Sequence, residues 1–249
     1  PNATNEGMLN RSQPPYASMM VREVYELTHD KIWLSYACKI LEKEYKFWMT
    51  ERITSNGLNR YSNHADKSSL MSFYYYVAGR LGLNPNECNN DEERLAVASH
   101  FLAEAESGWD FNPRFDSRCE DFNPIDLNAN LYAYEHNFAY FYKETGIGEY
   151  KKWVKAASRR KTLMDKLCLN PEDMLYYDYD YIHNRRSPIL SAAIFNTLFV
   201  RLAGKKQARA IYRNLGKLEC ANGVAACADG GRIRVYQWDY PNGWAALNY

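Results

Sequence analysis

A carboxylic acid set between two aromatic side chains is the feature of this sequence that most suggests chemistry. The stretch EAESGWDF spans residues 104–111 and places Asp110 between Trp109 and Phe111. Apolar neighbours disfavour the charged form of a carboxyl group and raise its pKa, so such an acid can keep its proton until a leaving oxygen needs it. Gly108 would let the backbone approach a ligand closely. The alternative is that Asp110 only caps or orders a turn.

Two further loops are rich in polar and aromatic residues. Residues 10–15 read NRSQPP, where Arg11 offers five donors in a fixed fork and Gln13 adds both a donor and an acceptor. This composition suits a neutral polyhydroxyl ligand, but an ordinary surface loop before a helix could also have it. Residues 237–244 read QWDYPNGW, in which two tryptophans flank a Pro-Asn-Gly turn. That loop could wall a sugar site or simply close a core.

Composition narrows the class of protein. The chain is expected to form one domain, residues 1–249, because no Gly/Pro/Ser-rich linker or charge block divides it. Its 46% hydrophobic and 24% charged residues are typical of a globular protein, and no apolar run approaches the roughly 18 residues that span a bilayer. The net charge of +1 argues against a nucleic-acid partner. The 21 tyrosines and 6 tryptophans are compatible with stacking on sugar rings.

Neither the cysteines nor the histidines form a metal-binding pattern. The six cysteines include no CxxC pair; Cys220 and Cys227 could close a short disulfide loop, and the alternative is that most cysteines are buried thiols. The five histidines form no HxH or HExxH arrangement. We therefore expect no metal site and no cofactor. The histidines concerned are His29, His64, His100, His136 and His183.

Hydrophobic periodicity predicts a mostly helical chain. Asp91 is the expected N-cap of one helix, and a Ser-Pro pair at residues 187–188 is expected to start another. The Tyr-rich residues 175–182 suggest a short strand or hairpin, and a basic run over residues 151–161 suggests a solvated helix face. Helices are expected over residues 14–28, 30–49, 69–81, 91–106, 128–145, 148–167, 187–202 and 205–215.

Four blocks in one order make the resemblance to a known family specific. They are RSQPP at residues 11–15, ESGWDF at 106–111, DLN at 126–128 and QWDYPNGW at 237–244, and LNRY at 58–61 is a weaker fifth. Together they are similar to the trehalases of glycoside hydrolase family 37, over essentially the whole chain. The resemblance implies an all-α fold, an (α/α)6 barrel or toroid that is incomplete in this chain, with the site at the mouth of the toroid.

The resemblance also implies roles for individual residues. Asp110 would be the general acid of an inverting hydrolysis of trehalose into two glucose molecules, which needs a second carboxylate to activate water. In the family that base is a Glu beyond the QWD block, so the chain, which resembles the middle portion of a trehalase, is expected to be inactive on its own. The residues expected to bind the substrate are Asn2, Arg11, Ser12, Gln13, Gly108, Trp109, Gln237 and Trp238.

One departure from the family pattern opens a second hypothesis. An Arg-Pro-Glu-Ser block should follow LNRY, but residues 63–70 read NHADKSSL and lack both the Arg and the Glu. Either the substrate contacts are rewired, with Lys67 a poor substitute for a planar Arg fork, or this homologue binds trehalose or a related glucoside with impaired catalysis. An (α/α)6 hydrolase with another glucoside substrate is a third possibility.

The compartment is weakly indicated. Sequons at Asn2 and Asn10, with six cysteines, favour a secreted or membrane-anchored extracellular parent. Any membrane association would come through segments outside this chain.

Overall fold

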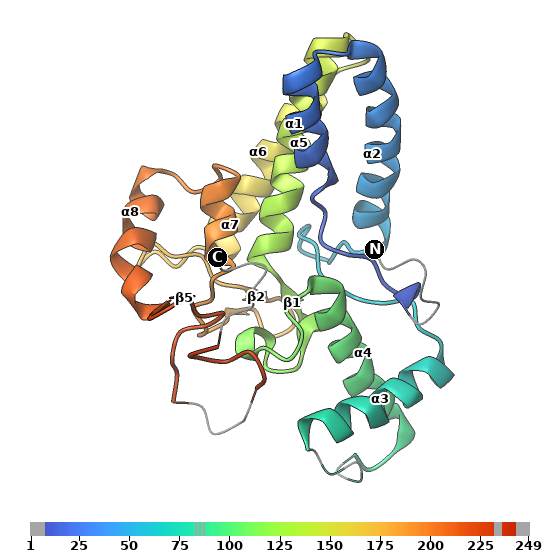
Figure 1. Cartoon of the computed structure of the whole chain (residues 1–249), viewed down its shortest axis with the longest axis vertical. Coiled ribbons are helices and arrows are strands. Elements are labelled where there is room, and N and C mark those ends of the chain that lie inside the picture. Colours follow the sequence, from blue (N-terminus) through green and yellow to red (C-terminus); the bar gives the residue numbers. More distant parts are fainter. Residues whose placement is uncertain (1–7, 83, 85, 87, 232–235, 243–249) are drawn as a thin grey trace.

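The computed structural model describes residues 8–82, 84, 86, 88–231 and 236–242. Long helices pack side by side at one end of the molecule, and a second helical pair and a loop-rich region with short strands lie at the other (Figure 1). The α-helices are α1 Ala17–Thr28, α2 Lys31–Glu51, α3 Lys67–Leu81, α4 Asp91–Ser107, α5 Ile125–Thr145, α6 Tyr150–Leu167, α7 Ile194–Phe199 and α8 Lys205–Asn214.

Helix α5 is the central element of the fold. It contacts α1, α2, α6 and α7, and 15 of its 21 residues are buried. A helix that is covered on nearly all sides belongs to the interior of a protein. The sequence pattern agrees, because α5 has no continuous charged face and its polar side chains at Asp126, Asn128 and Glu135 are themselves buried.

An aromatic cluster joins α1, α2, α5 and α6. Phe138 of α5 is fully buried and stacks on Trp153 of α6, with ring centroids 4.4 Å apart. Tyr45 of α2 meets both rings edge-on, and Leu34 and Leu41 of α2 fill the space beside them. Aromatic pairs at these separations stabilise a core beyond the area they bury. Packing therefore explains part of the tyrosine-rich composition.

Short strands cross between the helices. β2 (Tyr179–Asp180) pairs antiparallel with β1 (Phe122–Asn123) on one side and with β3 (Arg185–Arg186) on the other. The prediction of a short strand or hairpin within residues 175–182 is confirmed for a short strand, β2, and its hairpin partner β3 lies beyond that range. β4 (Glu219–Cys220) and β5 (Gly223–Val224) form a separate hairpin.

The helix predicted over residues 187–202 is wrong in most of its length, since only Ile194–Phe199 is helical. Ser187 does not cap a helix; its hydroxyl donates to the backbone carbonyl of Arg114 at 3.2 Å. The following backbone pairs with a distant segment, because Ala192 N–H donates to Ala226 O and Ala228 N–H donates to Leu190 O. Tertiary backbone pairing has replaced the local helix.

Two smaller predictions are corrected. The N-cap of α4 is Asn90, whose side chain accepts from Glu93 N–H, and not Asp91. The basic run on α6 is not wholly solvated, because Arg160 is buried. Its guanidinium pairs with Glu135 at 2.9 Å and donates to Asn59 and Asn128, so it holds α6 against α5.

The cysteines form no disulfide. All six are free, and the predicted alternative of buried thiols holds for Cys38, Cys119, Cys168 and Cys227. The loop closure suggested for Cys220 with Cys227 is therefore wrong. Among the described residues, no helix is long and apolar enough to cross a membrane.

Replacing Phe138 with Ala is expected to cost about 3–5 kcal/mol of unfolding free energy, because it leaves a cavity beside Trp153. The measurement is urea unfolding followed by tryptophan fluorescence. The matched control is Val154→Ala on α6, whose side chain is 49% exposed and whose loss should change stability by no more than about 0.5 kcal/mol. Equal effects of the two substitutions would contradict the central place given to the aromatic cluster.

Candidate active site

The residues on both sides of Asp110 determine the shape of the turn that carries it. Gly108 ends α4 in the left-handed region at φ +73°, a conformation that glycine adopts without a Cβ penalty. Phe111 also has a positive φ of 58°, which is strained for a bulky residue. Its N–H donates to the Glu104 carboxylate at 2.8 Å, and its carbonyl accepts from Trp238 N–H at 3.1 Å. These bonds hold the strained turn that fixes the direction of Asp110.

The Asp110 carboxyl is a weaker acid than an exposed aspartate. Burial raises the pKa of Asp110, and the opposing influences of its own backbone N–H, of Arg80 and of Arg11 do not cancel that rise. Desolvation therefore favours the protonated carboxyl, as the apolar neighbours in the sequence predicted. A group in this state can donate a proton at a pH where an exposed aspartate has already lost it.

Glu106, four residues before Asp110, binds three separate segments. Its carboxylate receives Nε and Nη2 of Arg52, both at 2.9 Å, and the backbone N–H groups of Ser12 and Ser62, both at 2.8 Å. Both Arg52 and Glu106 are buried. The RSQPP loop is thereby fixed to the end of α4, next to the Asp110 turn.

The RSQPP loop lies beside Asp110. The negative charges of Asp110 and Glu106 act on the Arg11 guanidinium; burial lowers the pKa of Arg11, and these two charges oppose that change. Ser12 is half-buried and Gln13 is exposed, with the Ser12 hydroxyl donating to the Gln13 carbonyl at 3.5 Å. The structure therefore brings Arg11 and Ser12 to the acid, and leaves the Gln13 side chain open to solvent.

The loop at residues 236–242 meets the Asp110 turn from the other side. Trp238 donates its N–H to Phe111 O, and its carbonyl accepts from the Asn112 amide at 3.2 Å. Gln237 accepts two hydrogen bonds from the Arg80 guanidinium, at 2.7 and 3.1 Å. Two of the predicted positions, Asn2 and Trp244 of the QWD block, lie outside the described residues.

Trp109 has a packing role that the sequence did not reveal. It is 6% exposed and is covered by the guanidinium of Arg114, 4.6 Å from the ring centroid. Arg114 in turn forms ion pairs with Asp126 at 2.6 Å and with Asp178 at 2.8 Å. The DLN block is therefore structural at two positions, because Asp126 anchors Arg114 and Asn128 bonds the backbone of Asn59.

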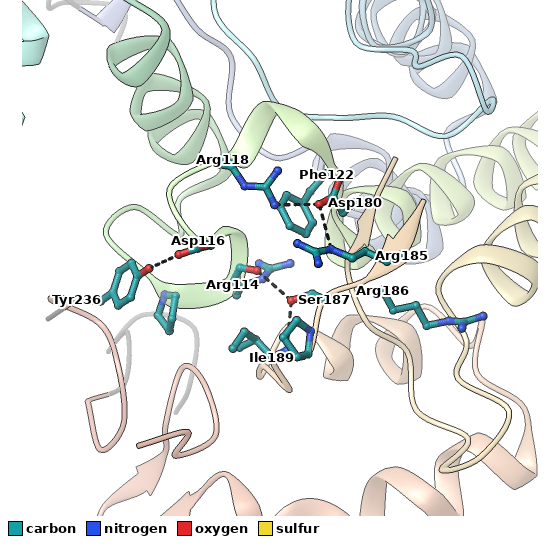
Figure 2. A pocket seen from close by; sticks show the side chains of 12 residues that line it. Arg114, Asp116, Arg118, Phe122, Asp180, Arg185, Arg186, Ser187, Ile189 and Tyr236 are labelled. Atoms are coloured by element: carbon teal, nitrogen blue, oxygen red, sulfur yellow. Dashed lines mark hydrogen bonds and ion pairs between the residues drawn. The ribbon is translucent and has the colours of Figure 1, made fainter. Parts of the chain in front are cut away.

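A cavity of about 340 Å³ adjoins these loops on the side of Asp116 and Tyr236 (Figure 2). The Tyr236 hydroxyl donates to Asp116 at 2.9 Å, and Arg118 and Arg185 both face Asp180, at 2.9 and 3.8 Å. None of the predicted site residues lines this cavity. We assign this cavity no role in the site around Asp110.

Two arginines and one glutamate near the acid carry roles that the sequence did not predict. Arg80 lies on α3 outside every motif, Arg52 is the C-cap of α2, and Glu106 lies in the ESGWDF block without a role assigned to it. Nothing in the local pattern distinguishes these arginines from surface residues, because their partners are 157 and 54 positions away along the chain. No group of His, Cys, Asp and Glu suited to a metal ion occurs among the residues that the structure describes.

Helices packed around a buried helix, with a desolvated carboxyl between an arginine-bearing loop and an aromatic loop, define the class: an all-α protein with a polar site at the end of α4. A comparison with family models makes the assignment specific. The model described as Trehalase matches residues 1–249, and the chain belongs to the trehalase family.

Relatives match nearly all of the chain but are longer. It is 29% identical to a cytosolic neutral trehalase of Beauveria bassiana and 31% identical to a probable trehalase of Saccharomyces cerevisiae, in each case over 98% of the chain. It is 28% identical to a periplasmic trehalase of Salmonella newport over all of its length. The matches cover 39%, 37% and 46% of those proteins, so the chain spans roughly two fifths of their length. The compartments named for these relatives are mixed.

Solved structures confirm the all-α toroid class. The chain is similar to the neutral trehalase Nth1 from Saccharomyces cerevisiae, with a TM-score of 0.80 and 28% identity, over 96% of this chain and 51% of that one. A mannosylglycerate hydrolase of family GH63 from Thermus thermophilus shares the fold, with a TM-score of 0.63 and 16% identity, over 95% of this chain and 62% of that one.

Replacing Glu106 with Gln is expected to destabilise the protein by about 3–5 kcal/mol, because the Arg52 charge then stays buried without its counter-charge. The matched control is Glu26→Gln, which removes an exposed ion pair with Arg22 and should cost about 1 kcal/mol or less. Denaturant unfolding measures both. A cost for Glu106→Gln no larger than that of the control would refute its role in joining the loops.

Proposed function

We propose that the protein containing this chain is an α,α-trehalase, which hydrolyses trehalose into two glucose molecules by an inverting acid/base mechanism. Asp110 is the general acid and protonates the glycosidic oxygen as the bond to the leaving glucose breaks. The base that activates water is, by the resemblance, a glutamate beyond the QWD block. The observation that carries the proposal is the desolvated Asp110 carboxyl on the ESGWDF turn, with Arg11 and the QWD loop beside it.

Other carboxylates near the turn are less suited to donate a proton. Glu104 accepts from the Phe111 backbone N–H, and Glu106 accepts four donors, two of them from a charged guanidinium. Both glutamates are fully buried, so neither can reach a substrate. Asp116 is exposed and accepts from the Tyr236 hydroxyl. These contacts favour Asp110 as the acid and give Glu104 and Glu106 structural tasks.

The substrate is proposed to be held mainly by the polar groups around the acid. Arg11, Ser12 and Gln13 offer donors and acceptors to sugar hydroxyls, and Gly108, Gln237 and Trp238 complete the wall. Trp109 was predicted to contact the sugar. It is only 6% exposed and the Arg114 guanidinium covers its ring, so only the exposed part of its side chain can touch the substrate. Asn2 is included through the resemblance alone.

A secreted or membrane-anchored location of the whole protein is proposed on the sequons at Asn2 and Asn10. It rested on two sequons and an even number of cysteines, and the cysteines are free thiols. Glycosidase treatment of the natural protein, followed by electrophoresis, would detect a glycan at Asn2 or Asn10.

Replacing Asp110 with Asn in the whole protein is expected to lower kcat by about 10²–10⁴-fold, the usual contribution of a general acid. KM should change far less, because the amide keeps the size of the side chain and Arg11 still holds the sugar. Arg11→Ala should instead raise KM by weakening substrate and transition state together. Glucose release from trehalose measures both variants.

The matched control is Asp116→Asn, which removes a neighbouring carboxylate from outside the proposed site and should leave turnover near normal. Glu104→Gln and Glu106→Gln complete the set of candidate donors. If Asp110→Asn keeps normal turnover while another variant that is still folded, as judged by its unfolding curve, loses it, the acid is that other residue. If the unaltered protein binds trehalose but releases no glucose, the impaired homologue is the correct hypothesis.

A further inference from the structure

The Arg80 guanidinium contacts both loops that frame Asp110. Its Nε and Nη2 donate to the Gln237 side-chain oxygen at 3.1 and 2.7 Å. Its planar group lies over the ring of Phe111, 4.6 Å from the centroid, and Phe111 directly follows the acid. The third nitrogen, Nη1, donates to the Tyr76 hydroxyl at 2.7 Å. One side chain thus connects the QWD loop to the Asp110 turn.

The backbone that carries Arg80 is held in place by a small apolar cluster. Val77 and Leu81 of α3 pack with Phe101 of α4 and with Phe111. Trp238 packs against the same cluster. Because α3 is fixed through both flanking positions, Arg80 leaves the helix at a defined point beside the acid, although the residue is exposed.

The start of α3 supplies no such group. Residues 63–70, which lack the arginine expected there, lead into α3 with Asp66 as its N-cap, and Lys67 is exposed. Arg80 lies at the opposite end of the same helix, in its last turn. The two ends of this 15-residue helix lie about 20 Å apart, so Arg80 makes a separate contact and does not replace the arginine missing from residues 63–70.

We propose that Arg80 is a positioning residue for trehalose hydrolysis, which fixes Gln237 against the Asp110 turn and places a positive charge beside the Asp110 carboxyl. The proposal rests on the trehalase function proposed above. Arg80 acts through Gln237 and through its charge, and it takes no part in bond breaking.

The charged groups around Asp110 come from three elements. Arg80 belongs to α3, Arg11 to the RSQPP loop, and Glu104 and Glu106 to α4. The two arginines oppose the rise in the pKa of Asp110 that burial causes. Removal of the Arg80 charge should therefore raise that pKa further. Because a general acid works in its protonated form, the alkaline limb of the kcat profile should then move to higher pH.

Two substitutions separate the charge of Arg80 from its shape. Arg80→Gln removes both, so KM for trehalose should rise by roughly tenfold, the loss of about one charge-assisted hydrogen bond, and the alkaline limb should move to higher pH. Arg80→Lys keeps the charge without the planar fork, so KM should rise while the limb stays near its original pH. The matched control is Arg209→Gln, an exposed arginine of α8, which should change neither quantity.

The outcomes separate this proposal from the function on which it rests. If the unaltered protein hydrolyses trehalose and Arg80→Gln changes neither KM nor the alkaline limb, the role of Arg80 is refuted and the trehalase function stands. If the unaltered protein releases no glucose, the trehalase function fails. The charge of Arg80 is then tested by NMR titration of the Asp110 carboxyl, where a pKa no higher in Arg80→Gln than in the unaltered protein overturns the proposal.

Discussion

The buried ion pair between Arg52 and Glu106 is the interaction on which the arrangement of the site depends. Glu106 takes four donors from three segments, at 2.8–2.9 Å. A buried pair of this kind contributes little net stability over an apolar pair, but the loss of one partner is costly. Its effect is therefore geometric. The loop with Arg11 and Ser12 cannot leave the end of α4 without removing one hydrogen-bond donor from the buried Glu106 carboxylate, and Asp110 lies one turn beyond that end.

Two more buried arginines extend the same principle across the fold. Arg114 pairs with Asp126 and Asp178 under Trp109, and Arg160 pairs with Glu135 between α5 and α6. Each guanidinium joins segments far apart in the sequence through hydrogen bonds of fixed direction. The loops around Asp110 thus rest on paired charges rather than on apolar packing alone, which allows a polar site to keep its shape.

Periodicity predicted the long helices well because their apolar faces meet neighbours along whole turns. α2, α4, α5 and α6 all occur where that pattern indicated, with ends shifted by a few residues. The helix prediction was wrong over residues 187–193 because the backbone there pairs with residues 226–228. A local sequence pattern carries no information about such a distant partner. The solvent exposure predicted for Arg160 was wrong for a related reason. Its charge suggested a solvated side chain, but the ion pair with the buried Glu135 compensates that charge inside the protein.

The parts of the site that consist of adjacent residues could be predicted from the sequence. The parts assembled from residues far apart in the chain could not. The order Gly-Trp-Asp-Phe suggested a desolvated acid at Asp110 and left a turn-ordering role open, and burial does raise the pKa of Asp110. No local pattern marked Arg80 or Arg52, because the role of each depends on a residue in another segment. The resemblance indicated the blocks but not the side chains that hold them together.

The central claim is that the folded protein keeps Asp110 protonated above the ordinary aspartate range. It is tested by the unfolding free energy of the unaltered protein and of Asp110→Asn as a function of pH. Because folding raises this pKa, the stabilisation from the protonated carboxyl is fully present below the unfolded pKa of about 3.9 and is lost as pH rises through the folded value. We predict that the unaltered protein loses stability relative to the variant over that interval and then reaches a plateau. A difference that stays constant, or that favours the unaltered protein as pH rises, would contradict the account.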